Sequence, residues 1–389
     1  MRINTLNIKN FRCFKSLRLN FETPISIIQG DNGAGKTSIL EAIHYMCYMR
    51  SFRASSPRDL IHFDSDNFFV KAGFTAHGTE SGKLEHEIQV GFSQNKKLVK
   101  LDKKHISSFK DLMDFYRVVT LVEDDLWLIK GGPDIRRAFL DNAILLVDHT
   151  FLGKLREFKK VLQQRNMLLQ LDRVTQESYD LWTRQLWEKS REIQVMRNKI
   201  ITVYQDCVNN ALKAVFVGVS QKSQGKPQSK LGKSRDAQAK SKESAITVSF
   251  EYKPKKMGLK LDYDQFISQM GDLKQQEMRF RRSLFGAHLD DFLIKFKSKK
   301  SKVYASRGQQ KLVVLLLKAA QLVNLSKERG QAVFLLDDFM TDFDEEKAEL
   351  LVSYLVSLGG QLIFTSPSKL GFFDDLLLRM GASKIKLSY

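Results

Sequence analysis

The sequence has few cysteines and no long apolar run. Its three cysteines, Cys13, Cys47 and Cys207, lie far apart and form no C-x-x-C pair. This spacing indicates neither a disulfide framework nor a zinc site, which fits the reducing cytoplasm. The longest apolar run covers only residues 312–317, and the start of the chain lacks the apolar core of a secretory signal. We therefore expect a cytoplasmic protein with no membrane association.

Acidic residues are outnumbered by basic ones. The chain has 44 Asp and Glu against 63 Lys and Arg, which gives a formal charge of +19 at pH 7. This excess indicates a polyanionic partner, either nucleic acid or an anionic membrane surface, and a merely basic surface is the simpler alternative. With 389 residues, of which 43% are hydrophobic and 10% aromatic, the chain can form two or three globular domains.

A glycine-rich loop of the form G-x-x-x-x-G-K-T is the clearest motif. It follows a β-branched apolar run at 24–29 and precedes apolar residues at helical spacing at 38–49. In such a loop the backbone N–H groups point at phosphate oxygens, the lysine reaches the β- and γ-phosphates as a catalytic residue, and the threonine hydroxyl binds Mg²⁺. The sequence therefore predicts a nucleoside triphosphate site formed by Gly30, Asp31, Asn32, Gly33, Ala34, Gly35, Lys36, Thr37 and Ser38.

A serine-led segment precedes a strongly apolar helix that begins near residue 311. Ser306, Gly308 and Gln309 stand where the orphan backbone N–H groups of the helix start can hold a phosphate. Taken alone, the same three residues are also explained by ordinary helix capping.

An apolar run at 332–336 ends in two acids, Asp337 and Asp338. This is the pattern of a buried parallel strand that delivers carboxylates to a phosphate loop. We predict that Asp337 holds Mg²⁺ together with Thr37, and that Asp338 is the general base for the attacking water. Thr365, after the next expected strand, could sense the γ-phosphate. The alternative is a strand that ends in a helix-capping pair of acids.

Arg12 lies in a short turn between two stretches of alternating polarity, 2–8 and 16–21. The phosphate loop is therefore expected to follow the third strand of a meander. From this position Arg12 could fold back onto bound nucleotide, and a surface arginine without a ligand is an equally open interpretation.

The expected fold is α/β: an ABC-type ATPase head, with a mixed sheet around the phosphate loop and an antiparallel β subdomain, into which a short helical arm is inserted. In such a head the serine segment lies too far from its own phosphate loop, so it must serve a second copy, and ATP would join two heads. The N-terminal part of the head is expected at 1–115 and the helical arm at 116–220. A flexible basic insertion is expected at 221–244 and the return of the arm at 245–285. The C-terminal part of the head, with the signature and Walker B motifs, is expected at 286–389.

Several motifs together resemble the RecF family of bacterial recombination ATPases, which are relatives of the SMC-type chromosome and repair proteins. The chain departs from the family at Leu289, where an arginine is usual, and at Pro367. The resemblance extends over nearly the whole chain and depends on Asn10-Phe11-Arg12, Gly30 to Thr37, Ser51-Phe52-Arg53, Arg136-Arg137, Phe139-Leu140-Asp141, Gln164-Arg165-Asn166, Gly286 to Asp291, Ser306 to Lys311 and Leu335 to Asp344.

This resemblance implies ATP and Mg²⁺ as cofactors and a slow, DNA-stimulated ATPase activity. It also implies an ATP-dependent homodimer that binds duplex DNA beside single-stranded gaps in DNA repair and replication. RecR and RecO would be its partners in loading recombinase.

Three other functions remain as alternatives. The first is an ATPase subunit of an ABC-type transport system, which the basic charge and the inserted helices disfavour. The second is an SMC-like ATPase of another DNA-processing complex. The third is an end-processing nuclease, which would need an additional acidic metal cluster that no segment after Asp344 supplies.

Overall fold

The computed structural model describes residues 1–77, 83–106, 117–222, 247–259, 261–338, 342–367 and 371–387. The chain forms two compact units. The head unit comprises Met1–Asp125, Ala214–Val219 and Leu315–Tyr389, and the arm unit comprises Leu126–Lys213 and Ser220–Val314. The basic insertion expected at 221–244 lies, from residue 223 onward, outside the described residues.

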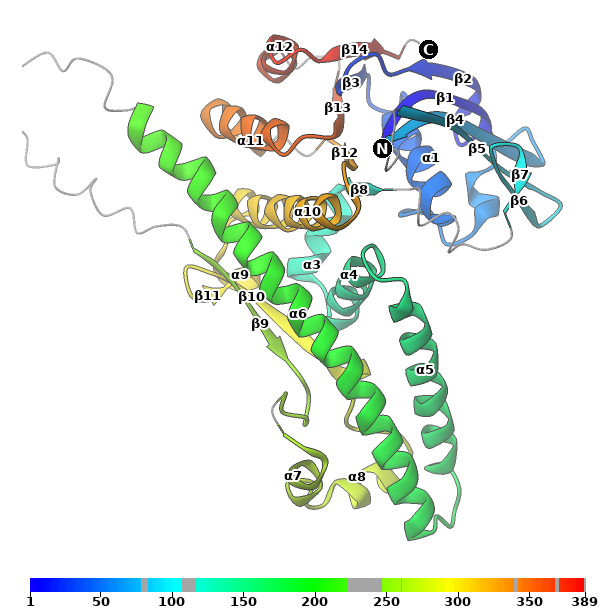
Figure 1. Ribbon diagram of the computed structural model, residues 1–389, viewed down its shortest axis with the longest axis vertical. Coiled ribbons are helices and arrows are strands. Elements are labelled where there is room, and N and C mark those ends of the chain that lie inside the picture. The colour runs from blue at the N-terminus through cyan, green and yellow to red at the C-terminus, as the bar shows by residue number, and fades with distance from the viewer. Residues whose placement is uncertain are drawn as a thin grey trace, which may run out of the picture. The chain divides into compact units, whose positions relative to one another are not determined.

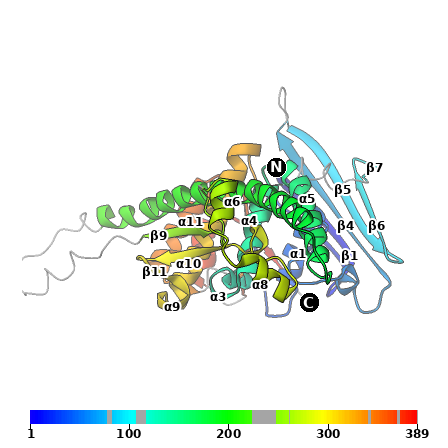
Figure 2. The same ribbon diagram turned by 90° about the horizontal axis from the view of Figure 1, so that it is seen from below.

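The head unit contains a six-stranded antiparallel sheet that presents one face to the core. Leu6, Ile8, Val70 and Val90 are buried on this face, and helix α1 (Lys36–Tyr48) packs on the same side (Figure 2). Alternating polarity at 67–75, 84–92 and 97–101 predicts an antiparallel sheet, and this prediction is confirmed. Its order is β2-β1-β4-β5-β6-β7, with β1 at Arg2–Phe11, β2 at Phe14–Asn20, β4 at Asn67–His77, β5 at Lys83–Ser93, β6 at Lys96–Leu101 and β7 at Lys104–His105.

A five-stranded parallel sheet forms the second layer of the head unit. Strand β3 (Ile25–Gly30) is buried along its whole length and lies between two other strands, so the prediction that it continues a meander is wrong. An all-buried run suits the centre of a parallel sheet, whereas β1 and β2 form an amphipathic hairpin. The order is β14-β3-β13-β12-β8, with β8 at Val118–Leu121, β12 at Val333–Leu336, β13 at Gln361–Pro367 and β14 at Ser383–Lys386.

Helices complete the head unit around the parallel sheet (Figure 1). Asp344 caps the start of helix α11 (Glu345–Ser357) by accepting a hydrogen bond from the backbone N–H of Lys347. Helix α12 is Gly371–Arg379, the 3₁₀ turn η1 is Pro57–Leu60, and the 3₁₀ turn η2 at Glu123–Leu126 leads into the arm unit. Among the described residues, none of the helices is both long enough and apolar enough to cross a bilayer.

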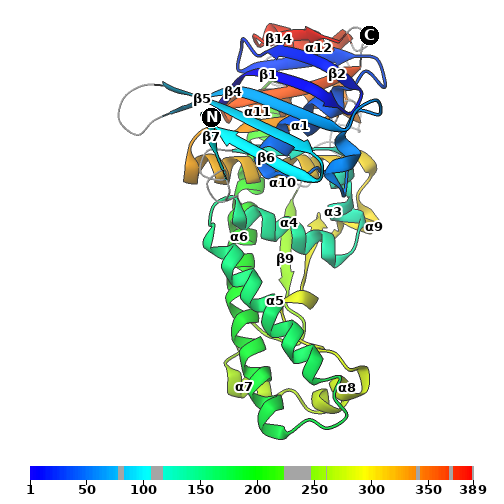
Figure 3. The same cartoon turned by 90° about the vertical axis from the view of Figure 1, so that its right-hand side faces the viewer.

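The arm unit is built on a helical hairpin. Helices α5 (Thr150–Leu168) and α6 (Gln176–Lys222) run side by side and are joined by a short turn, as the sequence predicts (Figure 3). Ion pairs connect them, since Lys154 contacts Glu192 at 2.7 Å and Lys189 contacts Glu157 at 2.7 Å.

The remaining elements of the arm unit are short. They are α3 (Trp127–Lys130), α4 (Pro133–Leu145), β9 (Val248–Lys253), α7 (Tyr263–Ser268), α8 (Leu273–Phe280), the 3₁₀ turn η5 (Ala287–Leu289), β10 (Asp291–Phe296), β11 (Lys299–Lys300), α9 (Ser301–Tyr304) and the start of α10 (Arg307–Arg329).

The sequence also predicts a short strand at 303–305 and a helix over 262–284, and both predictions are wrong. Residues 303–305 were expected as a strand, but β10 turns at Lys297 and Ser298, whose φ angles are 48° and 63°, and the returning strand β11 has only two residues before α9 begins. Residues 262–284 were expected as one helix, but they form α7 and α8, which are separated by a turn at Gly271. In the contact-based division, residues 286–314 fall in the arm unit, where β10 pairs with β9, and their assignment to the head stays a prediction.

Candidate nucleotide and metal site

The glycine-rich loop lies at the carboxyl end of β3, directly before α1. Gly33 and Gly35 both have φ of 89°, a conformation that glycine adopts without strain. Gly35 is required for a second reason, because a Cβ atom there would lie 2.4 Å from Phe14 Cζ and 2.6 Å from Cys13 Sγ. No side chain caps the start of α1, so its first N–H groups can point at an anion. The loop therefore has the backbone of a phosphate cradle.

Lys36 is the cation of this loop. Its ammonium group donates to the carbonyl oxygens of Gly30, at 3.0 Å, and Asp31, at 3.2 Å. The same nitrogen lies 3.9 Å from Asp338 Oδ2. The lysine side chain is buried, so its charge acts in a poorly solvated environment beside the loop.

Thr37 and Asp337 form the oxygen-rich part of the site. The Thr37 hydroxyl contacts both carboxylate oxygens of Asp337, at 2.8 and 3.0 Å, and Thr365 Oγ1 donates to Asp337 Oδ1 at 2.9 Å. Burial raises the pKa of the Asp337 carboxyl group above its ordinary value. A hydroxyl and a carboxylate are ligands that Mg²⁺ accepts, usually together with phosphate oxygens and water. These two residues therefore fit a magnesium ion bound with a nucleotide.

Asp338 has an unusual backbone conformation. Its side chain is 40% exposed and its φ is 41°, which is uncommon for a residue other than glycine. The backbone N–H donates to Thr365 Oγ1 at 2.8 Å, which fixes this conformation. A partly exposed carboxylate beside the phosphate loop is compatible with the predicted role of Asp338 as general base, which remains a prediction.

The structure thus brings together Lys36, Thr37, Asp337, Asp338 and Thr365 in the head unit. The remaining predicted residues of the loop differ in exposure. Asp31 and Asn32 are exposed, whereas Ala34 and Ser38 are buried.

Arg12 is engaged by a carboxylate. Its Nε and one terminal nitrogen contact the two oxygens of Glu41, at 2.8 and 2.7 Å, and the other terminal nitrogen donates to the carbonyl oxygen of Asp59 at 2.8 Å. Glu41 lies on α1 and is fully buried. A contact between Arg12 and nucleotide remains a prediction. Glu41 was not among the expected site residues, although one acid within the apolar run at 38–49 is a visible signal.

The serine-led segment belongs to the arm unit. The Gln309 N–H donates to Ser306 Oγ at 3.3 Å, and the Ser306 N–H donates to Gln309 Oε1 at 2.9 Å, so the two residues cap α10 reciprocally. A Cβ atom at Gly308 would have no heavy atom within 4 Å, which leaves open space at the helix start. Capping and phosphate binding are compatible here, because the cap uses only part of the N–H groups of the first turn.

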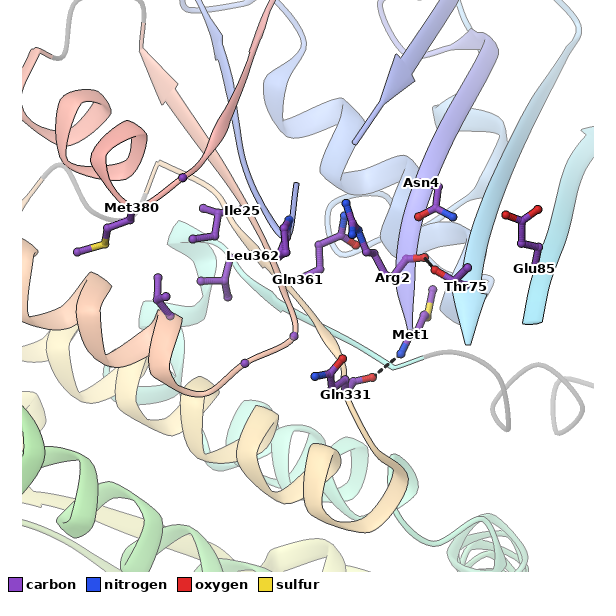
Figure 4. A pocket seen from close by; sticks show the side chains of 15 residues that line it. Met1, Arg2, Asn4, Ile25, Thr75, Glu85, Gln331, Gln361, Leu362 and Met380 are labelled. Carbon is purple, nitrogen blue, oxygen red and sulfur yellow. Dashed lines mark hydrogen bonds between the residues drawn. The ribbon is translucent and has the colours of Figure 1, made fainter. Parts of the chain in front are cut away.

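A cavity of about 720 Å³ lies at the other end of the parallel strands (Figure 4). Ile25 and Leu362, near the starts of β3 and β13, line it together with Arg2. The amino group of Met1 donates to the carbonyl oxygen of Gln331 at 2.7 Å, and burial lowers the pKa of this amino group to about 6. Because the glycine-rich loop follows the carboxyl end of β3, this cavity is separate from the nucleotide site.

Clusters of acids elsewhere do not suggest a second catalytic centre. Within the described ranges, no three His, Cys, Asp or Glu side chains are grouped so that they could hold a metal ion. The nuclease alternative requires such a cluster, and the described part of the chain does not provide it.

Comparisons with known proteins agree on one family. The profile of the RecF/RecN/SMC N terminal domain matches residues 2–372. The chain is 30% identical over 357 residues to the DNA replication and repair protein RecF of Acholeplasma laidlawii, covering 91% of this chain and 90% of that protein. It is 29% identical over 376 residues to the RecF of Prosthecochloris aestuarii, covering 95% of both chains.

Solved structures show the same fold. A structure described as the recombination mediator protein RecF-ATP in the RecFOR pathway has a TM-score of 0.75 at 24% identity, covering 95% of this chain and 92% of that one. The Smc head domain of Pyrococcus furiosus, bound to part of ScpA, has a TM-score of 0.52 at 15% identity, covering 97% and 91%. The ABC-type head expected from the sequence is therefore confirmed, and the chain belongs to the RecF family.

Proposed function

We propose that this protein is an ATP-dependent DNA-binding protein of recombinational repair and replication. It binds ATP and Mg²⁺, dimerises on ATP at junctions between single- and double-stranded DNA, and hydrolyses ATP slowly, with stimulation by DNA. It acts in the cytoplasm, with RecR and RecO as partners in loading recombinase. The observation that carries the proposal is the contact of Thr37 with Asp337 beside Lys36 and Asp338, which unites the phosphate loop with both acids.

Each residue of this assembly has a separate task. The glycine-rich backbone and Lys36 bind and orient the phosphates, and Thr37 and Asp337 hold the magnesium ion. When bound, Mg²⁺ neutralises phosphate charge and so assists the attack of water. Asp338 takes the proton of that water, and Thr365 keeps both acids in position through its hydrogen bonds.

Ser306, Gly308 and Gln309 act on the nucleotide of a second copy. The start of α10 offers N–H groups and the positive end of the helix dipole, which is the arrangement that binds a γ-phosphate. ATP therefore bridges two chains, and hydrolysis separates them.

The nucleotide site is tested first with Lys36→Ala. This variant should lose ATP binding, because the loop loses its only lysine, and it should also lose ATP-dependent dimerisation. Lys327→Ala, an exposed lysine of the head unit, is the matched control and should bind ATP normally. Unchanged nucleotide affinity in Lys36→Ala would remove the loop from the proposal.

Dimerisation is tested with Ser306→Arg, analysed by sedimentation with and without ATP. The variant should bind ATP as a monomer and fail to dimerise, since a large cation replaces the small cap. Ser357→Arg carries the same change on an exposed position of the head unit and should dimerise normally. A wild-type chain that stays monomeric with ATP would contradict the proposed dimer.

DNA binding is tested by the affinity for gapped, duplex and single-stranded DNA, with and without ATP, across a salt series. The proposal expects the gapped substrate with ATP to be bound best. Equal binding of all three would favour an SMC-like ATPase of another complex, a function that the fold similarity to the Smc head also supports.

A further inference from the structure

The antiparallel sheet of the head unit has an outward face that carries more positive than negative charge. Side chains alternate along each strand, so the buried residues of β4 and β5 define the inward face and the intervening residues face outward. Figure 3 shows this face toward the viewer, with α1 behind it. Among the described side chains, its basic residues include Lys9 of β1, Arg18 of β2, Lys71 of β4, and Lys96 and Lys100 of β6.

The strand register aligns these residues in rows across the sheet. In one row, Arg18 pairs with Asn7, which pairs with Lys71, then Gln89, Lys100 and finally His105. Strands lie about 4.8 Å apart, so the cations of β2, β4 and β6 repeat at intervals of about 10 Å. This row is a ladder of cations separated by amides. Neither Asn7 nor Gln89 adds a negative charge to it.

Most of these cations are not neutralised. Lys71 pairs with Glu87 at 2.5 Å, and that contact lowers the pKa of Glu87 below its ordinary value. Lys9, Arg18, Lys96 and Lys100 have no carboxylate within 4 Å in the described part of the chain. The outward carboxylates of these strands are Glu85 and Glu87. On the arm hairpin, by contrast, Lys154 and Lys189 each contact an acid.

The middle of this face has two positions without side chains. Gly73 and Gly91 both face outward there, on the central strands β4 and β5. Gly73 is needed for packing, because a Cβ atom would lie 2.8 Å from Thr5 Oγ1. At Gly91 the nearest atom would be 3.6 Å away, so the fold itself leaves room for a side chain. A strand glycine that packing does not require allows another backbone to approach closely.

We propose that this outward face binds the phosphate backbone of DNA. The proposal rests on the DNA binding proposed above and adds the surface that performs it. Unneutralised cations on a flat sheet attract a polyanion by releasing its counterions, and the contacts carry no base specificity. If this face only contacted solvent, alternating polar and apolar side chains would be sufficient, and an excess of positive over negative charge would not be required.

The test is the salt dependence of duplex DNA binding by the full chain. The triple variant Lys9→Gln, Arg18→Gln, Lys100→Gln removes three phosphate contacts, so the slope of log affinity against log salt should flatten by about 2.7. Between 50 and 200 mM salt, the wild-type affinity should then fall about 40-fold more than that of the variant. ATP binding serves as the folding control and should not change.

The matched control is Lys327→Gln, Arg379→Gln, Lys386→Gln, which removes the same charge from exposed positions of the head unit. It should keep the wild-type slope. A flattened slope in both triple variants would show an effect of net charge and overturn the proposal, and so would a wild-type slope in the first variant. If the wild-type chain binds no DNA under any condition, the proposed function itself fails.

A single substitution tests whether the removal of a negative charge makes the salt dependence steeper. Glu87→Gln removes the acid that neutralises Lys71 and leaves the sheet register intact. The salt slope should steepen by about 1, because Lys71 becomes available to a phosphate. An unchanged or shallower slope would overturn the role given to this face.

Discussion

A buried ion pair of the arm unit and the charged residues beside the glycine-rich loop of the head unit have different partners. In the arm unit, Arg165 is fully buried, and its guanidinium contacts both oxygens of Glu277, at 3.0 and 2.6 Å. Ser283, Thr183 and Tyr179 supply further hydrogen bonds to this pair. In the head unit, Lys36 is held by loop carbonyls, and Asp338 is 40% exposed. The arm pair is satisfied within the fold, whereas Lys36 and Asp338 lie beside the loop that is predicted to bind a nucleotide.

The difference lies in which partners the charges have. Arg165 also lies over the rings of Tyr179 and Phe285, at 5.1 and 4.8 Å from their centroids, so the pair connects α5, α6 and the region around α8. Only its Nε lacks a partner. In the head, Asp337 accepts hydrogen bonds from the hydroxyls of Thr37 and Thr365, and carboxylate and hydroxyl oxygens are ligands that Mg²⁺ accepts.

If charge in the head serves chemistry, Asp338→Asn should have the largest effect. The amide cannot accept a proton, so ATP turnover should fall by about 10²–10⁴-fold while ATP stays bound and the dimer accumulates. Asparagine tolerates positive φ, so the backbone at this position is preserved. Phosphate release is measured alongside nucleotide binding. Normal turnover in this variant would exclude Asp338 as the base.

If the buried ion pair stabilises the arm unit, the Arg165→Met variant should have a lower free energy of unfolding than the wild-type chain. Glu277 would remain buried without its cation, which costs about 3–5 kcal/mol. Trp127, Trp182 and Trp187 are the three tryptophans of the chain and all belong to the arm unit, so their fluorescence during urea unfolding reports on this unit.

The matched variant is the double substitution Arg165→Met, Glu277→Leu. Removing both charges should restore much of the lost free energy of unfolding, because an apolar pair leaves no uncompensated charge. A single variant as stable as the wild-type chain would contradict the structural role of Arg165.

A smaller effect is expected from His44, a half-buried base of the head unit. Burial lowers its pKa to about 3, and its Nδ1 contacts Thr120 Oγ1 at 2.8 Å. In the unfolded chain His44 takes up a proton near pH 6.5, whereas in the folded chain it stays neutral until about pH 3. The free energy of unfolding therefore has its highest value above pH 6.5 and decreases as the pH falls toward 3. The loss at pH 5 should be about 1–2 kcal/mol, and His44→Gln should reduce it. Thermal unfolding followed by circular dichroism at pH 7 and pH 5 measures the difference, and equal pH dependence in both chains would contradict it.

The smallest effect is expected from an exposed ion pair of the arm hairpin. Lys189 contacts Glu157 at 2.7 Å and Glu192 at 3.3 Å, and its side chain is 31% exposed. Lys189→Gln should lower the free energy of unfolding by only about 0.2–1 kcal/mol, because solvent screens the pair. Tryptophan fluorescence measures this as well. A loss as large as that of Arg165→Met would erase the distinction between surface and buried charge in this unit.

Local sequence was enough to predict the parts of the site that are continuous in the chain. The glycine loop, the strand that ends in Asp337 and Asp338, and the helix that Ser306 caps each depend on neighbouring residues. The roles of these residues remain predictions. The hairpin of α5 and α6 was also predictable, since its apolar positions repeat at helical spacing.

Long-range pairing was not predictable in the same way. Arg165 and Glu277 are separated by 112 positions, and neither residue is unusual within its own helix. The place of β3 depends on β13 and β14, which come more than 300 residues later. Arg12 is a similar case, because its position in a turn does not reveal that Glu41 lies beneath it.

The packing of Cys13 against Gly35 has a practical consequence. Cys13 is exposed, Cys47 is buried and Cys207 is intermediate, so a thiol-reactive dye has one preferred attachment point once Cys207 is changed to serine. Because the sulfur lies against the loop that is predicted to bind phosphate, the fluorescence of a small dye at Cys13 should change when nucleotide binds. Cys13 is thus a native labelling site for following nucleotide binding over time.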